Sequence, residues 1–191
     1  NEHYMKLPKR KEGEFRFLYI AHNYPSKNLS IIKLLIPLLR GFNIKFIITI
    51  DDLSFKDLFK NTIAADHIIN LGPIPSISCP SVYHQCDALF APTLLETFSA
   101  AYPESMKSGI PILTSEYSFS KDVCADAALY FNPISPKDIS QKIINLVSNR
   151  KLQKKLISRG LLRLRDFETA RSRAEKYIEL CENIINKEKN V

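Results

Sequence analysis

Glycine is scarce in this chain of 191 residues, with five glycines at positions 13, 41, 72, 109 and 160. Two phosphate-binding patterns, G-x-G-x-x-G and G-x-x-x-x-G-K-[ST], need closely spaced glycines and can be written nowhere in the sequence. The sequence therefore disfavours an NAD-dependent dehydrogenase and a P-loop nucleotidase.

Cysteine and histidine are also few and scattered, with four of each and no C-x-x-C pair. Their spacings predict neither a zinc site nor a disulfide framework, which fits a reduced, cytosolic compartment. No apolar run approaches the roughly 20 residues that span a bilayer, and the start, NEHYMKLPKR, has no signal-peptide core. We expect a soluble protein, and the absence of an initial Met indicates a fragment of a longer chain.

The net charge of +7 is unevenly placed along the chain. Residues 15–149 carry eleven basic and eleven acidic groups, whereas residues 150–191 carry twelve basic groups and six acidic ones. This excess is typical of a solvated helix face, and the alternative is a contact with an anionic membrane surface. We do not expect nucleic acid as a partner, because no aromatic-basic interleaving or recognition motif accompanies the charge.

Apolar runs too short for helices alternate with helical patterns, as in a parallel sheet with crossover helices. The predicted strands are 15–21, 43–50, 67–72, 88–92, 110–115 and 127–132, and the predicted helices are 28–41, 54–66, 76–86, 100–109 and 135–149. Ser135 is the expected N-cap of the last of these helices. A helical tail follows from Arg150 to Lys187, with a break near Gly160. The fold class is α/β: a Rossmann-like, doubly wound parallel sheet with helices on both faces and a C-terminal helical tail.

The loop after the first strand, HNYPSKN, is a candidate anion site, because ligands bind such sheets at the carboxyl ends of the strands. Lys27 stands just before a helix that we expect to start near Leu29, so an ammonium group and a helix N-terminus can face the same anion. A solvated lysine near a helix start is the alternative.

The loop after the strand at 88–92 places Glu96 in a turn, and residues 97–99 offer backbone N-H groups. Pro103 favours a helix that opens close to Tyr102, with Glu104 in its first turn. Both carboxylates then border one crevice. Each carboxylate taken alone is also explained without a ligand, as a solvated loop Glu and a dipole-compensating Glu.

These charges suit a nucleotide sugar. One carboxylate can accept hydrogen bonds from both ribose hydroxyls, a diphosphate needs N-H groups and a cation, and a hexose offers its hydroxyls to a second carboxylate. Glu104, Lys27 and Glu96 match these three roles.

The stretch APTLLETFSAAYPESMKSGIPILTS (91–115) resembles the E-x7-E segment of the retaining family 4 glycosyltransferases, whose usual form is P-S-x-x-E-G-F-G, then E-A-M, then G-x-P-V. The spacing matches throughout, and FLYIAHNYPSKN is similar to the family's first donor-domain strand with its R-x4-K loop. The resemblance covers about residues 15–150 and implies one half of a two-domain GT-B fold. It implies that residues 15–191 are the donor-binding domain, with C-terminal helices from about 150, and that residues 1–14 are a linker from a missing N-terminal acceptor domain.

The resemblance also implies roles for individual residues. Glu96 would be catalytic and contact the transferred sugar, Glu104 would bind the ribose, Lys27 would bind the diphosphate and Ile74 would lie near the base. The backbone of three further residues would hold sugar or diphosphate groups: Thr97, Phe98 and Ser99.

Two departures from the family pattern affect this site. His22 stands where the family has an arginine, so a permanent cation is replaced by a group that is at best partly charged at neutral pH. Thr97 and Ser99 replace the glycines that flank the family's Phe, which bears on how closely the backbone can approach a ligand.

The implied reaction is metal-independent and needs no cofactor beyond the nucleotide diphosphate sugar, since protein cations and helix N-termini neutralise the leaving diphosphate. By family habit we expect surface polysaccharide assembly in the cytoplasm, with a peripheral position at the inner membrane. Two alternatives stay open: a non-catalytic nucleotide-sugar-binding module, and an interaction or scaffold domain with a basic tail.

Apolar residues in the tail recur at three- and four-residue steps and predict one stripe along a helix. They are Leu164, Phe167, Ala170, Ala174, Tyr177, Ile178, Cys181 and Ile185. We expect this stripe to pack against the domain, which leaves the basic face to meet the acceptor half or an anionic membrane.

Overall fold

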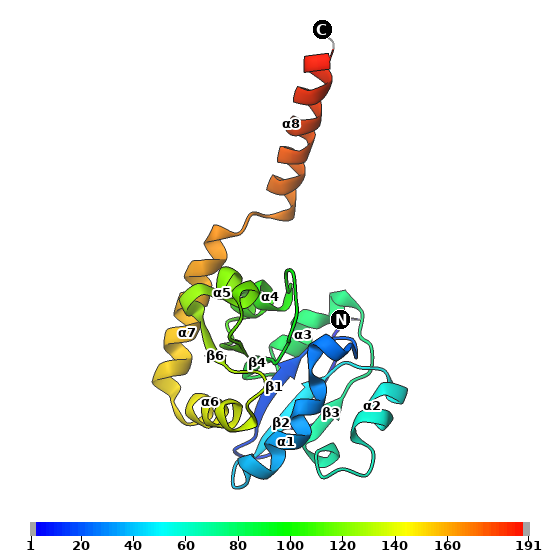
Figure 1. Cartoon of the computed structure of the whole chain (residues 1–191), viewed down its shortest axis with the longest axis vertical. Helices are drawn as coiled ribbons and strands as arrows, with labels where there is room; N and C mark the ends of the chain where they lie inside the picture. The colour runs from blue at the N-terminus through cyan, green and yellow to red at the C-terminus, as the bar shows by residue number, and fades with distance from the viewer. Residues whose placement is uncertain (1–2, 189–191) are drawn as a thin grey trace.

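A six-stranded parallel sheet forms the centre of the computed structural model, which describes residues 3–188 (Figure 1). Its strands are β1 Phe15–Tyr19, β2 Ile44–Ile48, β3 Ile68–Asn70, β4 Ala88–Ala91, β5 Ile112–Ser115 and β6 Ala128–Phe131. Their order across the sheet is β3-β2-β1-β4-β5-β6, and all neighbouring strands are parallel. The predicted sheet is therefore confirmed, with each strand shorter than the apolar run that predicted it.

Helices cover both faces of the sheet (Figure 1). The α-helices of the described residues are α1 Ile32–Leu35, α2 Asp52–Phe59, α3 Cys79–Tyr83, α4 Ala101–Ser108, α5 Ser118–Cys124, α6 Pro136–Ser148, α7 Arg150–Arg163 and α8 Ala170–Glu188. From β1 the chain adds β2 and β3 on one side and then β4, β5 and β6 on the other. Because the crossovers are right-handed, α1 lies on one face of the sheet and α3 and α4 lie on the opposite face. The next two helices lie on opposite faces as well, because α6 packs on α1 and α7 packs on α4.

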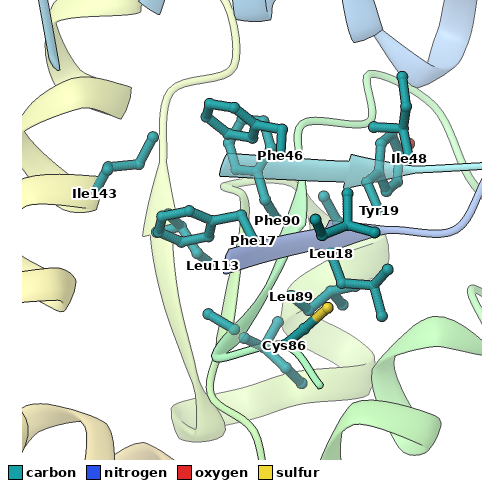
Figure 2. Packing of buried hydrophobic residues seen from close by; sticks show 14 of the residues in the cluster. Phe17, Leu18, Tyr19, Phe46, Ile48, Cys86, Leu89, Phe90, Leu113 and Ile143 are labelled. Atoms are coloured by element: carbon teal, nitrogen blue, oxygen red, sulfur yellow. The ribbon is translucent and has the colours of Figure 1, made fainter. Parts of the chain in front are cut away.

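Phenylalanine rings from neighbouring strands fill the core (Figure 2). The ring of Phe17 lies 5.7 Å from that of Phe46 and 6.1 Å from that of Phe90, and all three are buried. Phe131 continues the row, 5.7 Å from Phe90. Strands buried on both faces read as continuous apolar runs rather than alternating ones, which explains why the sequence located them.

Three helix predictions differ from the structure. The segment at 28–41 is not one helix but the 3-10 turn Leu29–Ile31, the four-residue α1 and the 3-10 turn Ile36–Leu39. Pro37 lies at the start of the last turn and cannot continue an α-helix from α1. The helix predicted at 54–66 ends at Phe59, soon before Asn61 takes a left-handed backbone with φ 59°. The seven-residue α5 was not predicted, because it is too short for a periodic pattern.

The predicted break near Gly160 is wrong, because α7 runs through this residue to Arg163. Gly160 is buried, and a Cβ atom there would lie 3.2 Å from Cγ of Met106 in α4. The glycine therefore permits close contact between two helices. The break in the tail lies at residues 164–169.

The predicted packing of the tail stripe is wrong for most of its length. Leu164 and Phe167 pack against the core, but α8 projects away from the domain (Figure 1). The large apolar side chains of α8 are exposed: Tyr177, Ile178, Leu180, Ile184 and Ile185. Periodicity shows that a helix has an apolar side but not which surface covers it.

The segment before β1 contacts α3 and the turn that follows it. Leu7 is buried and its N-H donates to Oε1 of Gln85 at 3.0 Å, and Arg10 forms an ion pair with Asp87 at 2.7 Å. That residues 1–14 are a linker from another domain stays a prediction, and residues 1–2 lie outside the described residues. No helix in the described part of the chain is long and apolar enough to cross a membrane.

Candidate functional site

The crevice between the carboxyl ends of β1 and β4 is the candidate site. The strand order reverses between these two neighbours, so the loops that follow them leave toward opposite faces of the sheet. The loops meet at one backbone hydrogen bond, in which the N-H of Leu94 donates to the carbonyl oxygen of Ser26 at 2.7 Å.

Lys27 and Glu96 form an ion pair across this crevice, between Nζ and Oε2. Their side chains are 20% and 18% exposed. The other oxygen of Glu96 accepts a 3.2 Å hydrogen bond from the N-H of Thr97. The structure thus brings together the two loop charges that the sequence singled out from distant parts of the chain.

Tyr19, the last residue of β1, holds together the loop after β1 and the loop after β4. Its buried hydroxyl lies 2.6 Å from Oγ1 of Thr93 and donates to the carbonyl oxygen of Lys27 at 3.3 Å. Burial raises the pKa of Tyr19 above its usual value, so the group stays a neutral hydroxyl. Sequence reasoning missed Tyr19, although a tyrosine in a buried strand needs a hydrogen-bond partner for its hydroxyl.

A hollow of about 290 Å³ opens beside Lys27 at the ends of β1 and β2. It is lined by Ile20, Ala21, His22, Lys27, Thr49, Pro73 and Ile74. Three predicted donor-binding residues, His22, Lys27 and Ile74, therefore share one hollow. The helix N-terminus expected after Lys27 is a 3-10 turn that starts at Leu29, since the α-helix begins only at Ile32.

Glu104 lines a separate hollow of about 280 Å³ between α3 and α4. It lies in the first turn of α4, as predicted, and its Oε2 accepts a 2.9 Å hydrogen bond from the hydroxyl of Tyr83. Burial, with a further contribution from the charge of Glu104, raises the pKa of Tyr83 above its usual value. Tyr83 was also missed, although it stands in a predicted helix and needs a partner for its hydroxyl.

The loop after Glu96 offers backbone donors. Within the described residues, no protein group accepts a hydrogen bond from the N-H of Phe98 or Ser99. None of residues 97–99 has a positive φ, so Thr97 and Ser99 fit where the resembling family has glycine.

The side chain of Phe98 lies beside the tail and does not line the hollow that contains Lys27. It is 51% exposed and meets the ring of Phe167 edge-on at 6.3 Å, where a third hollow lies between α4 and the start of α8. Five of the eight predicted site residues therefore line three separate hollows, whereas Glu96, Thr97 and Ser99 line none of the three. Over residues 3–188, no three His, Cys, Asp or Glu side chains are grouped to hold a metal ion.

Comparison with known proteins identifies the family and the fold. An uncharacterized glycosyltransferase of Methanocaldococcus jannaschii is 25% identical over 156 residues, which are 78% of this chain and 43% of that protein. The structure of sucrose-phosphate synthase from Thermosynechococcus elongatus matches with a TM-score of 0.76 and 16% identity, over 91% of this chain and 46% of that one.

A similar match is WaaG, a glycosyltransferase involved in lipopolysaccharide biosynthesis, with a TM-score of 0.70 and 17% identity, over 89% of this chain and 47% of that one. The chain thus spans less than half the length of each of these proteins. The sheet and its helices match GT-B glycosyltransferase structures, as predicted.

The family pattern described as glycosyl transferases group 1 matches residues 2–163. The matched part contains all six strands and every site residue that the sequence predicted. The chain therefore belongs to the glycosyl transferases group 1 family.

Proposed function

We propose that this chain is the donor-binding domain of a retaining glycosyltransferase that moves a sugar from a nucleotide diphosphate sugar to an acceptor. The observation that carries the proposal is the meeting of Lys27 and Glu96 between β1 and β4. This is the point in a doubly wound sheet where ligands bind, and it holds a cation for a diphosphate beside a carboxylate for a sugar.

Donor binding exchanges the partners of this ion pair. The diphosphate takes Lys27, and His22 faces the same hollow as a second group for the phosphates. Glu96 is then free to accept hydrogen bonds from the sugar and to stabilise positive charge at its anomeric carbon. The unpaired N-H groups of Phe98 and Ser99 add donors for the leaving diphosphate, in a reaction that uses neither a metal nor a further cofactor.

The nucleoside occupies the neighbouring surface. Glu104, oriented by Tyr83, binds the ribose hydroxyls, and Ile74 lies against the base. The chain works together with an acceptor-binding domain. That domain would correspond to the part of the related proteins that this chain does not cover. The setting is surface polysaccharide synthesis in the cytoplasm, a role supported by the likeness to WaaG.

A thermal-shift panel tests donor binding directly. Nucleoside diphosphates with different bases, and their sugar conjugates, are added to the chain and to its Lys27→Ala variant. We expect one base series to raise the melting temperature with concentration, because a ligand of the native state stabilises it by mass action, and the variant to lose most of the shift. No shift with any nucleoside diphosphate contradicts the proposal and favours a scaffold domain.

A non-catalytic nucleotide-sugar-binding module is the second candidate, and His22 favours it by replacing a permanent cation near the leaving group. The test is turnover by the protein that also contains the acceptor-binding domain. If the enzyme is catalytic, His22→Ala lowers sugar transfer while donor still binds. If it is a pure binder, donor binds to both forms and neither form transfers sugar.

A further inference from the structure

The basic excess of the tail lies on α7 and not on α8. Residues 150–165 contain seven basic side chains and no acidic one, whereas residues 170–186 contain three of each. The projecting α8 is therefore electrically balanced over this length, and α7, which packs on α4, carries the charge.

Two of the seven cations belong to the inner side of α7. Arg159 forms a 3.2 Å ion pair with Asp126, and Arg163 pairs with Asp166 at 2.9 Å. The other five are exposed and have no acidic partner among residues 3–188: Arg150, Lys151, Lys154, Lys155 and Arg165. Four of them lie on α7, and Arg165 lies in the 3-10 turn directly after it.

Apolar side chains lie among these cations. A shallow groove of about 400 Å³ runs along α7 and is lined by Lys154, Ile157, Ser158, Leu161, Leu162 and Arg165. Leu161 is 47% exposed and Leu162 is 56% exposed. A single exposed leucine is common on protein surfaces, whereas two adjacent leucines in a groove with a cation at each end form a surface that is both apolar and cationic.

We propose that this outer face of α7 docks on an anionic membrane surface. A bilayer supplies both chemistries that the face requires, since anionic headgroups meet the lysines while the boundary of the acyl chains takes up Leu161 and Leu162. Lysine side chains are long enough to reach the headgroups while the apolar residues insert.

Other occupants fit the face less well. A second copy of the chain would bring five cations against five cations. Nucleic acid would match the charge but not the aliphatic centre, because single-stranded binding surfaces use aromatic rings for stacking. An acidic protein segment is the remaining alternative partner, and the experiment distinguishes it from a membrane. The proposal does not depend on the function proposed above.

The experiment is co-sedimentation of the chain with vesicles of equal parts phosphatidylglycerol and phosphatidylcholine at physiological ionic strength, compared with vesicles of phosphatidylcholine alone. Two variants remove the two chemistries separately: Lys154→Gln with Lys155→Gln, and Leu161→Gln with Leu162→Gln. One matched control removes the same charge from two exposed lysines, Lys56 in the last turn of α2 and Lys60 just after it, by Lys56→Gln with Lys60→Gln. The other removes the same apolar groups from α8, by Ile178→Gln with Ile184→Gln.

We expect binding to the anionic vesicles and little to the neutral ones. The α7 lysine pair should lower the partition coefficient about 30-fold, or about fivefold per lysine, and the leucine pair about 10-fold. Both controls should stay within about twofold of the parent, with unchanged melting curves in all variants.

Three results overturn the proposal. The first is no binding to anionic vesicles, and the second is an equal loss of binding in the α2 control, which would show that net charge alone acts. The third is retention on immobilised polyglutamate without retention on vesicles, which would identify an acidic protein surface as the partner.

Discussion

The hydroxyl of Tyr83 donates a 2.9 Å hydrogen bond to Oε2 of Glu104 and so joins the end of α3 to the first turn of α4. Tyr83 is almost fully buried, whereas Glu104 is exposed to solvent. A neutral hydroxyl that donates to a carboxylate fixes its orientation without cancelling its charge. No donor among residues 3–188 is bonded to Oε1 of Glu104, so this oxygen keeps its acceptor sites.

Removal of the Tyr83 hydroxyl should weaken binding of a nucleoside diphosphate, although Glu104, the proposed partner of its ribose, is still present. We expect Tyr83→Phe to weaken nucleoside diphosphate binding by about 1 kcal/mol, and Glu104→Ala by about 1–3 kcal/mol, as measured by titration calorimetry. Tyr102→Phe is the control, because it removes another buried hydroxyl, bonded to Thr114, away from the hollow. Unchanged affinity in Glu104→Ala would remove the ribose assignment, and unchanged affinity in Tyr83→Phe would show that orientation does not matter.

Lys27 should discriminate between ligands with and without phosphate. We expect Lys27→Ala to lose about 1.5–3 kcal/mol of affinity for the nucleoside diphosphate and little affinity for the bare nucleoside, because the charged hydrogen bond involves the phosphate alone. Lys33→Ala removes a lysine of α1 that does not line the hollow, and its affinities should match those of the parent. Equal losses for both ligands in Lys27→Ala would show that the lysine is not a phosphate ligand.

In the proposed site, Glu96 and a bound diphosphate would compete for the ammonium group of Lys27. We therefore expect Glu96→Gln to bind the nucleoside diphosphate more tightly, by up to about 1 kcal/mol, the range of partly exposed ion pairs. The nucleotide sugar should gain less, because its hexose loses the carboxylate. Glu116→Gln breaks a surface pair with Lys121 and should change neither affinity. If Glu96→Gln weakens diphosphate binding as strongly as Lys27→Ala does, the two residues cooperate on the phosphate and the exchange does not occur.

The parts of the fold that follow from local pattern were predictable. The runs around Phe17 and Phe46 are apolar apart from Arg16 and Lys45, because both faces of a parallel sheet are covered. Strand ends gather at one edge of the sheet, so Lys27 and Glu96 were expected there from their places after two strands.

The parts that depend on contacts between distant residues were not predictable. The hydrogen bonds of Tyr19 and Tyr83 join segments far apart in the sequence, and no local pattern names their partners. The stripe of α8 has helical spacing, yet periodicity holds no information on what covers it.

Gly160 shows the same limit and allows a last prediction. Read locally, a glycine in a helical pattern predicts a break, but here a missing Cβ leaves room for Met106 of α4. Gly160→Ala gains about 1 kcal/mol of helix propensity against a tight 3.2 Å contact, so the free energy of unfolding should change little. Gly160→Val adds two further carbons and should destabilise by about 1–3 kcal/mol in urea denaturation. Ser158→Val, on the exposed side of the same helix, is the control for β-branching and should cost well under 1 kcal/mol. If the two valine variants lose equal stability, Gly160 serves the helix and not its contact with Met106.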